Sequence, residues 1–198
     1  MIKILNFMKK RKLFSSLVIT LLLGLLFGGI FLLLLNEESY EIMSSSINTY
    51  FSNIRNNNVD YIDSFIVSLV NNISVCIIIW LLGISIIGSL LVYIIFLFKC
   101  FSVFISFFSI INVYGIKGIL LSIIYIIPYV INVLILFILS YYAISFSILI
   151  YKYFFRGCDY NRKVIVKRYI KVLIICLLLF IVTSIVDVFL IPRILLLF

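Results

Sequence analysis

The stretch from Trp80 to Ser147 constrains the fold more than any other part of this chain. It carries only two charged residues, Lys99 and Lys117. A helix or strand at the surface of a water-soluble domain shows a polar face, and this stretch has none. We therefore expect it to lie inside a membrane, where its glycines, its one proline and its two lysines mark the points at which helices break, cross or surface.

The composition of the whole chain agrees with this interpretation. The 198 residues are 66% hydrophobic and 12% charged, with a mean hydropathy of +1.36, which is typical of polytopic membrane proteins. A spanning helix takes about 20 residues, so there is room for about five or six spans and little for a soluble domain. A net charge of +9 would suggest nucleic acid in a soluble protein. Here the basic residues sit beside spans and are expected to set orientation, so no nucleic-acid partner is predicted.

We predict an all-α fold, a polytopic integral membrane bundle of about five spans that forms a single membrane domain over residues 1–198. The first apolar run is longer than the core of a signal peptide and is read as a retained span. Gly24 and Gly28 within it have the G-x-x-x-G spacing that lets helices approach closely. In order, the expected segments are a cytoplasmic basic tail (1–12), span 1 (13–35), an outer acidic amphipathic segment (36–70), a core with spans 2 to 4 (71–151), a cytoplasmic basic loop (152–171) and span 5 (172–191).

Two placements of Lys99 compete. In the favoured one Lys99 lies at the cytoplasmic boundary, between spans of about 73–98 and 100–114, because a lysine at the bilayer centre costs roughly 2.5–3.5 kcal/mol on insertion scales. In the other, the chain turns at Gly83–Gly88 and Lys99 lies in mid-membrane. It would then need a partner, and Asp187 is the one acid inside an apolar run.

The apolar run from Ile119 to Ile150 is too long for one straight span. Pro128 divides it, which predicts a short interfacial or re-entrant piece followed by a span from about Pro128 to Tyr151. A broken or re-entrant helix is therefore expected around Gly115–Pro128, with Gly115 and Gly118 in the preceding loop.

The outer segment is acidic, with Glu37, Glu38, Glu41, Asp60 and Asp63 against Arg55 alone. Apolar residues from Ile42 to Ile54 recur at helical intervals, which indicates an amphipathic helix at the outer surface, and a solvated loop is the alternative. Asn71 and Asn72 are costly inside a bilayer and are expected to cap a helix or to bond between helices. Most of the 16 lysine and arginine residues fall in segments that five spans would place in the cytoplasm, with the N-terminus inside and the C-terminus outside.

No catalytic constellation is evident, and no enzymatic activity or cofactor is expected. Histidine is absent, which removes the commonest general base and metal ligand. Glu37, Glu38 and Glu41 cluster at a helix exit and read as a solvated face rather than as a glycosidase pair. Asp187 is the candidate intramembrane charge, either as a proton or ion ligand or as a partner of Arg193.

The core carries a series of glycine breaks, charges and small-residue motifs in a defined order and spacing: Trp80, Gly83-Ile84-Ser85, Ile87-Gly88, Phe98-Lys99, Gly115, Gly118, Pro128 and Ala143-Ile144-Ser145-Phe146-Ser147. In this series the chain resembles the stage II sporulation protein M family. The chain departs from the family pattern at Cys100, where glycine is usual, and at Leu90, where proline is frequent. Both departures concern local geometry. We expect Gly83 and Gly88 to serve helix packing.

The resemblance implies a non-enzymatic scaffold in the engulfment machinery of a spore-forming bacterium. In that role it would recruit two peptidoglycan-degrading partners, stage II sporulation proteins P and D, to the septal membrane of the mother cell. Glu37, Glu38 and Glu41 are then the candidate partner surface; lipid contact is expected and self-association stays open. The alternative is a small transporter or permease-like subunit, with a path lined by Lys99, Asn71, Asn132 and Asp187.

Overall fold

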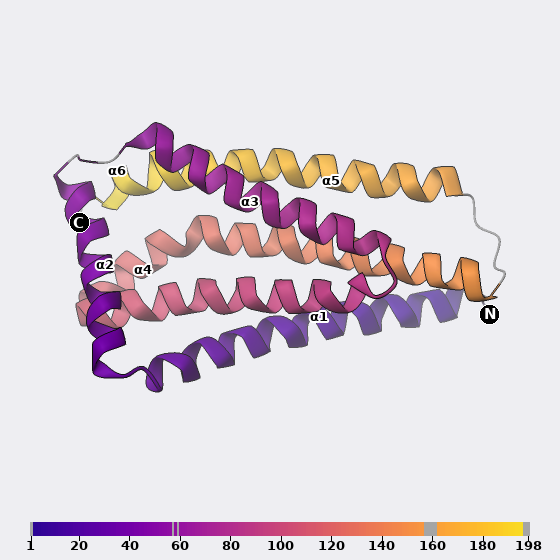
Figure 1. The fold of residues 1–198 in the computed structure, drawn as a ribbon, viewed down its shortest axis with the longest axis horizontal. Coiled ribbons are helices and arrows are strands. Elements are labelled where there is room, and N and C mark those ends of the chain that lie inside the picture. Colours follow the sequence, from indigo (N-terminus) through magenta and orange to yellow (C-terminus); the bar gives the residue numbers. More distant parts are fainter. Residues whose placement is uncertain (1, 57, 59, 157–161, 196–198) are drawn as a thin grey trace.

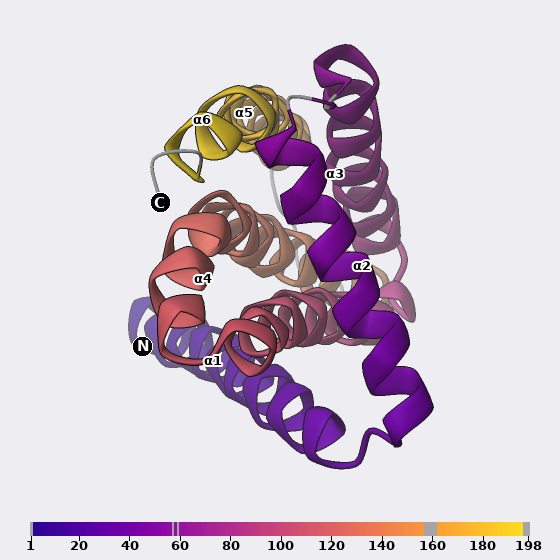
Figure 2. The same ribbon diagram turned by 90° about the vertical axis from the view of Figure 1, so that its left-hand side faces the viewer.

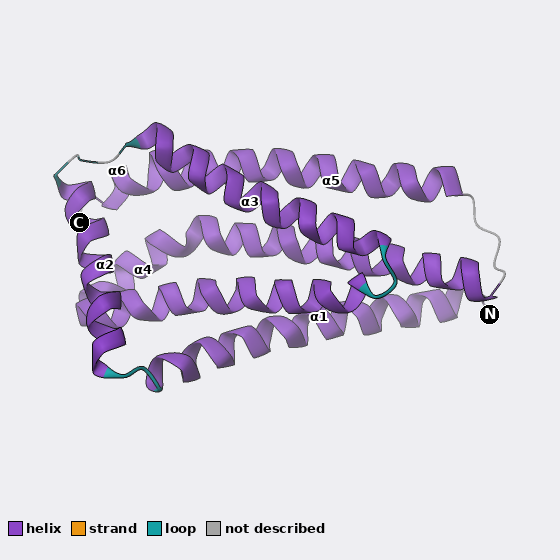
Figure 3. Ribbon diagram, in the orientation of Figure 1, coloured by secondary structure: helices purple, strands orange, loops and turns teal. Residues whose placement is uncertain are grey.

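The computed structural model describes residues 2–56, 58, 60–156 and 162–195, and in this part of the chain it contains helices and turns but no strand (Figure 3). The all-α prediction is confirmed. The elements in chain order are α1 (Ile2–Leu33), α2 (Glu37–Arg55), α3 (Tyr61–Ile84), α4 (Gly88–Arg156), α5 (Arg162–Ile185), a π-helix η1 (Val186–Leu190) and α6 (Ile191–Leu195).

The long helices lie side by side along the longest dimension of the molecule, and α2 lies across one end of them (Figures 1 and 2). We call this end, where α6 also lies, the α2 end. α1 begins at the opposite end, which we call the turn end because the α3–α4 connection lies there (Figure 1).

Helix α4 folds back on itself at Gly115. This residue has φ 59° and ψ −134°, a conformation that is essentially restricted to glycine because a Cβ would clash with the backbone. The part of α4 after the break first crosses the α2 end and then runs back along the bundle (Figure 2). Pro128 lies within this second part, where a proline removes one helical hydrogen bond and bends the helix. The predicted break is therefore present at Gly115.

Within the described residues, four helices are long and apolar enough to cross a membrane. Their apolar stretches are Lys12–Leu33, Tyr61–Ile84, Gly88–Phe155 and Lys163–Leu195. Many large apolar side chains on these helices face outward; Leu26 of α1, for example, is 62% exposed. An outer surface of this kind is suited to lipid rather than to water.

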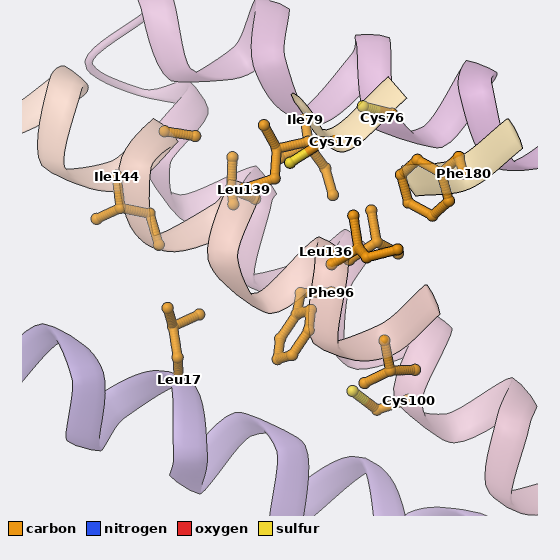
Figure 4. Close-up of a cluster of buried hydrophobic side chains, with 14 of the residues drawn as sticks. Leu17, Cys76, Ile79, Phe96, Cys100, Leu136, Leu139, Ile144, Cys176 and Phe180 are labelled. Atoms are coloured by element: carbon orange, nitrogen blue, oxygen red, sulfur yellow. The ribbon is translucent and has the colours of Figure 1, made fainter. Parts of the chain in front are cut away.

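The core runs along the middle of the bundle, where α1, α3, α5 and both parts of α4 meet (Figure 4). Phe96 and Phe180 are its largest fully buried side chains, and Leu17 is the α1 residue at its centre. Cys76, Cys100 and Cys176 are buried free thiols in the same region, where cysteine packs as a small apolar residue.

Glycines let α1 approach α4 closely. A Cβ added to Gly24 would lie 2.6 Å from Cβ of Cys100, and one added to Gly28 would lie 3.2 Å from Cβ of Phe104. Neither distance leaves room for an ordinary contact between carbon atoms, which is about 3.5–4.0 Å. Gly29, on the same helix, has no atom of another element within 4 Å of such a Cβ. The G-x-x-x-G pair therefore forms a close seam with α4, and Gly29 does not.

The favoured placement of Lys99 was wrong. α3 ends at Ile84 and α4 begins at Gly88, so Lys99 lies inside α4 and no helix ends at 98. The physical reason is that α3 begins earlier than expected. Asp60 caps it by accepting hydrogen bonds from the backbone N–H groups of Ile62 (3.1 Å) and Asp63 (3.3 Å). A 24-residue helix that starts there is about 36 Å long, so it is long enough to cross a bilayer by Ile84.

Other segment boundaries also differ from the prediction. Residues 61–70, assigned to the outer segment, belong to α3, and the outer segment is left with α2. A basic loop was predicted over 152–171, but α4 continues to Arg156 and α5 begins at Arg162, so most of this range is helical. Charged residues at the end of a spanning helix extend into the interface while the backbone keeps its helical hydrogen bonds. The helix that contains the predicted span 5 likewise begins before residue 172, at Arg162.

Candidate functional site

A polar cavity of about 320 Å³ lies in the half of the bundle next to the α2 end. α2, α3, both parts of α4, η1 and α6 all contribute to its wall. It is lined by Tyr50, Ile54, Ser64, Val67, Ser68, Asn71, Asn72, Lys99, Val103, Tyr129, Asn132, Val133, Leu136, Asp187, Val188 and Pro192. Two residues of opposite charge and three asparagines are thus gathered in a helix bundle whose outer surface is apolar.

Asp187 supplies the negative charge of the cavity. It lies in the π-helix η1, a type of segment that is rare and occurs often at functional sites. The hydroxyl of Ser68 on α3 donates a hydrogen bond to its Oδ2 at 3.1 Å, and the hydroxyl of Tyr129 on α4 also interacts with the carboxylate. There is no ion pair between Asp187 and Arg193. The carboxylate is therefore held by hydroxyl groups of two other helices.

A chain of polar contacts joins α3 to α5 beside Asp187. The amide NH₂ of Asn72 donates to Oγ of Ser184 at 3.3 Å, and the Ser68 hydroxyl also reaches Ser184, at 3.4 Å. The expectation that Asn72 bonds between helices is confirmed. Hydrogen bonds of this kind within a membrane bundle contribute about 0.6 kcal/mol on average, so their main effect is to fix which faces of the helices meet.

Asn132 is positioned in the same way from the other side of the cavity. Its side-chain oxygen accepts a hydrogen bond from the Thr183 hydroxyl at 2.6 Å. This leaves the amide NH₂ group of Asn132 as a donor toward the cavity that it lines.

Lys99 supplies the positive charge. Among the residues that the structure describes, no side chain or backbone group forms a hydrogen bond or ion pair with its ammonium group, and Asp187 is not in direct contact with it. Burial without a partner is costly for an ammonium group. The cavity therefore contains one charge that is held by the protein and one that is not.

Helix α2 forms the wall of the cavity at the α2 end of the bundle. Tyr50 and Ile54 are the α2 residues that line the cavity, and Ile54 packs in a small cluster with Ile191 and Leu195 of α6. On α4, the Tyr114 hydroxyl donates to Oδ1 of Asn48 at 2.8 Å. α2 is thus fixed to both sides of the opening, and the predicted amphipathic helix, not the alternative loop, is present.

The other face of α2 carries the predicted partner surface. Glu37, Glu38 and Glu41 are all exposed, and the first two lie in the first turn, where negative charge stabilises the helix dipole. Asn36 caps this turn by accepting a hydrogen bond from the Ser39 N–H at 3.3 Å. The three carboxylates do not take part in the cavity.

Several residues that carry the family resemblance meet at the turn end instead. Trp80 stacks on Tyr169 of α5 with ring centroids 5.5 Å apart, and Phe146 stacks on the same Tyr169 ring at 4.3 Å. The Tyr169 hydroxyl donates to the backbone oxygen of Trp80 at 2.7 Å. A Cβ added to Gly83 would collide with that hydroxyl and lie 2.8 Å from Cβ of Ala143. Gly83 thus lies where α3, α4 and α5 come closest.

The connection between α3 and α4 uses the rest of these residues. The Ser147 hydroxyl donates to the backbone oxygen of Ser85 at 2.9 Å, and the backbone N–H of Gly88 reaches the Ser85 hydroxyl at 3.4 Å. A Cβ on Gly88 would collide with the backbone oxygen of Leu82. Gly88 therefore serves the turn, rather than contact with a separate helix. The Ser145 side chain forms a hydrogen bond with the hydroxyl of Tyr141, which lies one turn earlier in α4.

Gly118 lies near the Gly115 break, where a Cβ would come within 2.6 Å of the Ile110 oxygen. The predicted residues thus fall into four groups: the exposed face of α2 (Glu37, Glu38, Glu41), the cavity (Lys99, Asp187), the turn end (Trp80, Gly83, Ser85, Gly88, Ser145, Ser147) and the second part of α4 from its reversal to Pro128 (Gly115, Gly118, Pro128). Ser68, Tyr129, Thr183 and Tyr169 were missed. Isolated hydroxyl residues in apolar runs are common, and the sequence contains no signal that singles these out.

Comparison with known proteins identifies one family. The family model for stage II sporulation protein M matches residues 17–192, which include every helix from α2 to η1 and most of α1. No curated protein and no solved structure matches the chain.

Proposed function

Because the chain belongs to the stage II sporulation protein M family, we propose that this sporulation-related membrane protein acts as a non-catalytic scaffold of the engulfment machinery. In this role it recruits the peptidoglycan-degrading stage II sporulation proteins P and D to the mother-cell septal membrane. Its helices cross the membrane five times, with α4 counted twice, the turn end in the cytoplasm and the α2 end outside.

The observation that carries the scaffold proposal is the placement of α2. It is a 19-residue helix fixed across one end of the bundle, and it presents Glu37, Glu38 and Glu41 to solvent. Enzymes that cut the cell wall work on the outer side of the membrane. A rigid, exposed helix on that side gives them a surface that a flexible loop would not, because less ordering is needed on binding.

The polarity of the two ends supports the orientation. The acidic residues of α2 and of the start of α3 lie at the α2 end, and the basic residues at the start of α5 lie at the turn end. Lysine and arginine are enriched in cytoplasmic segments of membrane proteins.

The test reverses the charge of the α2 surface. We expect Glu37→Lys, Glu38→Lys and Glu41→Lys together to reduce co-purification of stage II sporulation proteins P and D from sporulating cells. Each exposed ion pair is worth about 0.2–1 kcal/mol, so the three together should weaken binding by roughly threefold to about 150-fold. The matched control is Ser45→Ala with Thr49→Ala, which alters exposed residues of the same helix and leaves its charge unchanged.

Unchanged recovery of both partners with a charge-reversed protein that inserts normally would show that this surface is not the binding site. Cleavage of peptidoglycan by the purified protein alone would refute the non-catalytic role.

A second candidate, a small transporter or permease-like subunit, is favoured by the cavity that contains Lys99, Asn71, Asn132 and Asp187. Transport would require movement of a solute across sealed vesicles that contain the protein. Vesicles without the protein provide the control, and equal uptake by the two would exclude this function.

A further inference from the structure

We propose that the cavity binds a small zwitterion, a molecule with an anionic group and a primary ammonium group a few bonds apart. The anionic group would bind Lys99 and the ammonium group would bind Asp187. This inference concerns binding alone and does not depend on the scaffold proposal, because it uses residues inside the bundle and none of the exposed face of α2.

The state of Lys99 is the first argument. Lys99 lines the cavity, and its ammonium group has no partner among the described residues. A lysine in a membrane bundle is normally paired or hydrated, because an isolated buried charge costs several kcal/mol. An anionic group in the cavity would provide the missing partner.

The position of Asp187 is the second argument, and it determines the kind of ligand. A simple anion would provide a charged partner for Lys99 alone and a simple cation one for Asp187 alone, although both residues line the same cavity. The two residues do not pair directly. Charges that line one cavity without touching are best matched by a molecule that carries both opposite charges itself.

The size and the remaining lining of the cavity are the third argument. At about 320 Å³ it lies at the lower end of the range for small-molecule sites, about 300–1,000 Å³, and has the space of roughly ten water molecules at about 30 Å³ each. Asn71, Asn132 and Ser64 add uncharged donors and acceptors around the two charges. A polar ligand can thus exchange its water for hydrogen bonds to the protein.

The same chemistry occurs in two sources, free amino acids and the head group of phosphatidylethanolamine. The first arm of the experiment uses purified protein in nanodiscs of phosphatidylglycerol alone and measures binding of radiolabelled glycine, β-alanine and γ-aminobutyrate, in which the two charges are progressively further apart. Acetate and methylamine, each with one of the two charges, are the matched competitors. The second arm measures retention of phosphatidylethanolamine against phosphatidylglycerol by native mass spectrometry.

We expect a zwitterion of one of these two sources to bind, and the singly charged competitors to displace it at concentrations at least about tenfold higher, since a hydrogen bond to a charged group is worth about 1.5–3 kcal/mol. Binding in the first arm identifies a free solute, and selective retention in the second identifies the lipid. Failure of every zwitterion in both arms, or equal binding of acetate, would overturn the proposal and leave a cavity that holds water.

Variants then locate the site. Lys99→Met and Asp187→Asn should each weaken binding about tenfold or more, whereas Lys99→Arg should retain part of it. The matched controls are Lys117→Met and Asp63→Asn, because both residues are exposed and lie outside the cavity. Unchanged affinity in Lys99→Met would also refute the assignment. If a variant fails to fold, the comparison of zwitterions with singly charged competitors on the unaltered protein still decides the question.

Discussion

The seam between α1 and α4 allows a sharp test of the helix packing, because α1 contains both contacting and non-contacting glycines. Substitution by alanine adds only a Cβ. At Gly24 this atom would lie 2.6 Å from Cβ of Cys100, at Gly28 it would lie 3.2 Å from Cβ of Phe104, and at Gly29 it would meet nothing within 4 Å. All three substitutions gain the same helix propensity, about 0.8–1.0 kcal/mol, so differences between them report the contact with α4.

The size of the effect follows from these distances. To restore a contact of about 3.5 Å at Gly24, α1 and α4 must separate locally by roughly 1 Å, which removes about a quarter to a half of the 0.1–0.2 kcal/mol in each neighbouring atom pair. Spread over about 40 pairs, the loss is roughly 1–4 kcal/mol, in line with about 1–3 kcal/mol for overpacking elsewhere. We therefore expect Gly24→Ala to be about 1–3 kcal/mol less stable than Gly29→Ala, with Gly28→Ala between them.

The assay is unfolding of the purified protein by sodium dodecyl sulfate in mixed micelles. Trp80 is the only tryptophan, and its ring stacks on Tyr169 of α5, so its fluorescence reports separation of the bundle. Equal unfolding free energies for Gly24→Ala and Gly29→Ala would refute the close seam. A destabilised Gly29→Ala would show that this face of α1 has a partner outside the monomer, such as a second copy of the chain.

Three further outcomes are expected. Gly115→Ala should destabilise the bundle by about 1–3 kcal/mol, because the backbone at this position is nearly restricted to glycine; unchanged stability would mean that the α4 reversal relaxes without strain. Tyr169→Phe keeps the ring stack but loses the 2.7 Å hydrogen bond to the Trp80 oxygen, so unfolding should become easier by about 0.5–1.5 kcal/mol, and a larger loss would mean that the stack itself had changed. In a variant without native cysteines, an impermeant maleimide should label Ser45→Cys in intact cells and label Lys163→Cys only after lysis; the reverse pattern would contradict the proposed orientation.

Much of the architecture could be predicted from local signals in the sequence. The apolar runs predicted spanning helices, the spacing of Ile42 and Ile54 predicted an amphipathic helix, and the glycine at 115 marked the break in α4. These features depend on periodicity and backbone conformation, which are properties of neighbouring residues.

The errors arose where distant residues decide the outcome. Lysine at a helix boundary is the usual case, but α3 begins at its Asp60 cap and ends at Ile84, so Lys99 lies inside α4. The groups that surround Lys99 there come from segments far apart in the sequence. The wall of its cavity comes from Asn72, Asn132 and Asp187 on three different helices. The π-helix around Asp187 and the stack of Tyr169 on Trp80 also depend on tertiary packing, for which hydropathy has no signal.

The two faces of α2 have a thermodynamic consequence. Tyr50 on one face lines the cavity, while Glu41 on the other faces solvent, and α2 is joined to α1 and α3 at its two ends. A protein that binds α2 in a shifted position would change the affinity of the cavity for its occupant, and the occupant would change the affinity for that protein by the same factor. If one ligand changes the binding free energy of the other by 1.4 kcal/mol, each of the two affinities changes tenfold. Helix α2 would then couple the binding of a protein on its exposed face to the binding of a ligand in the cavity.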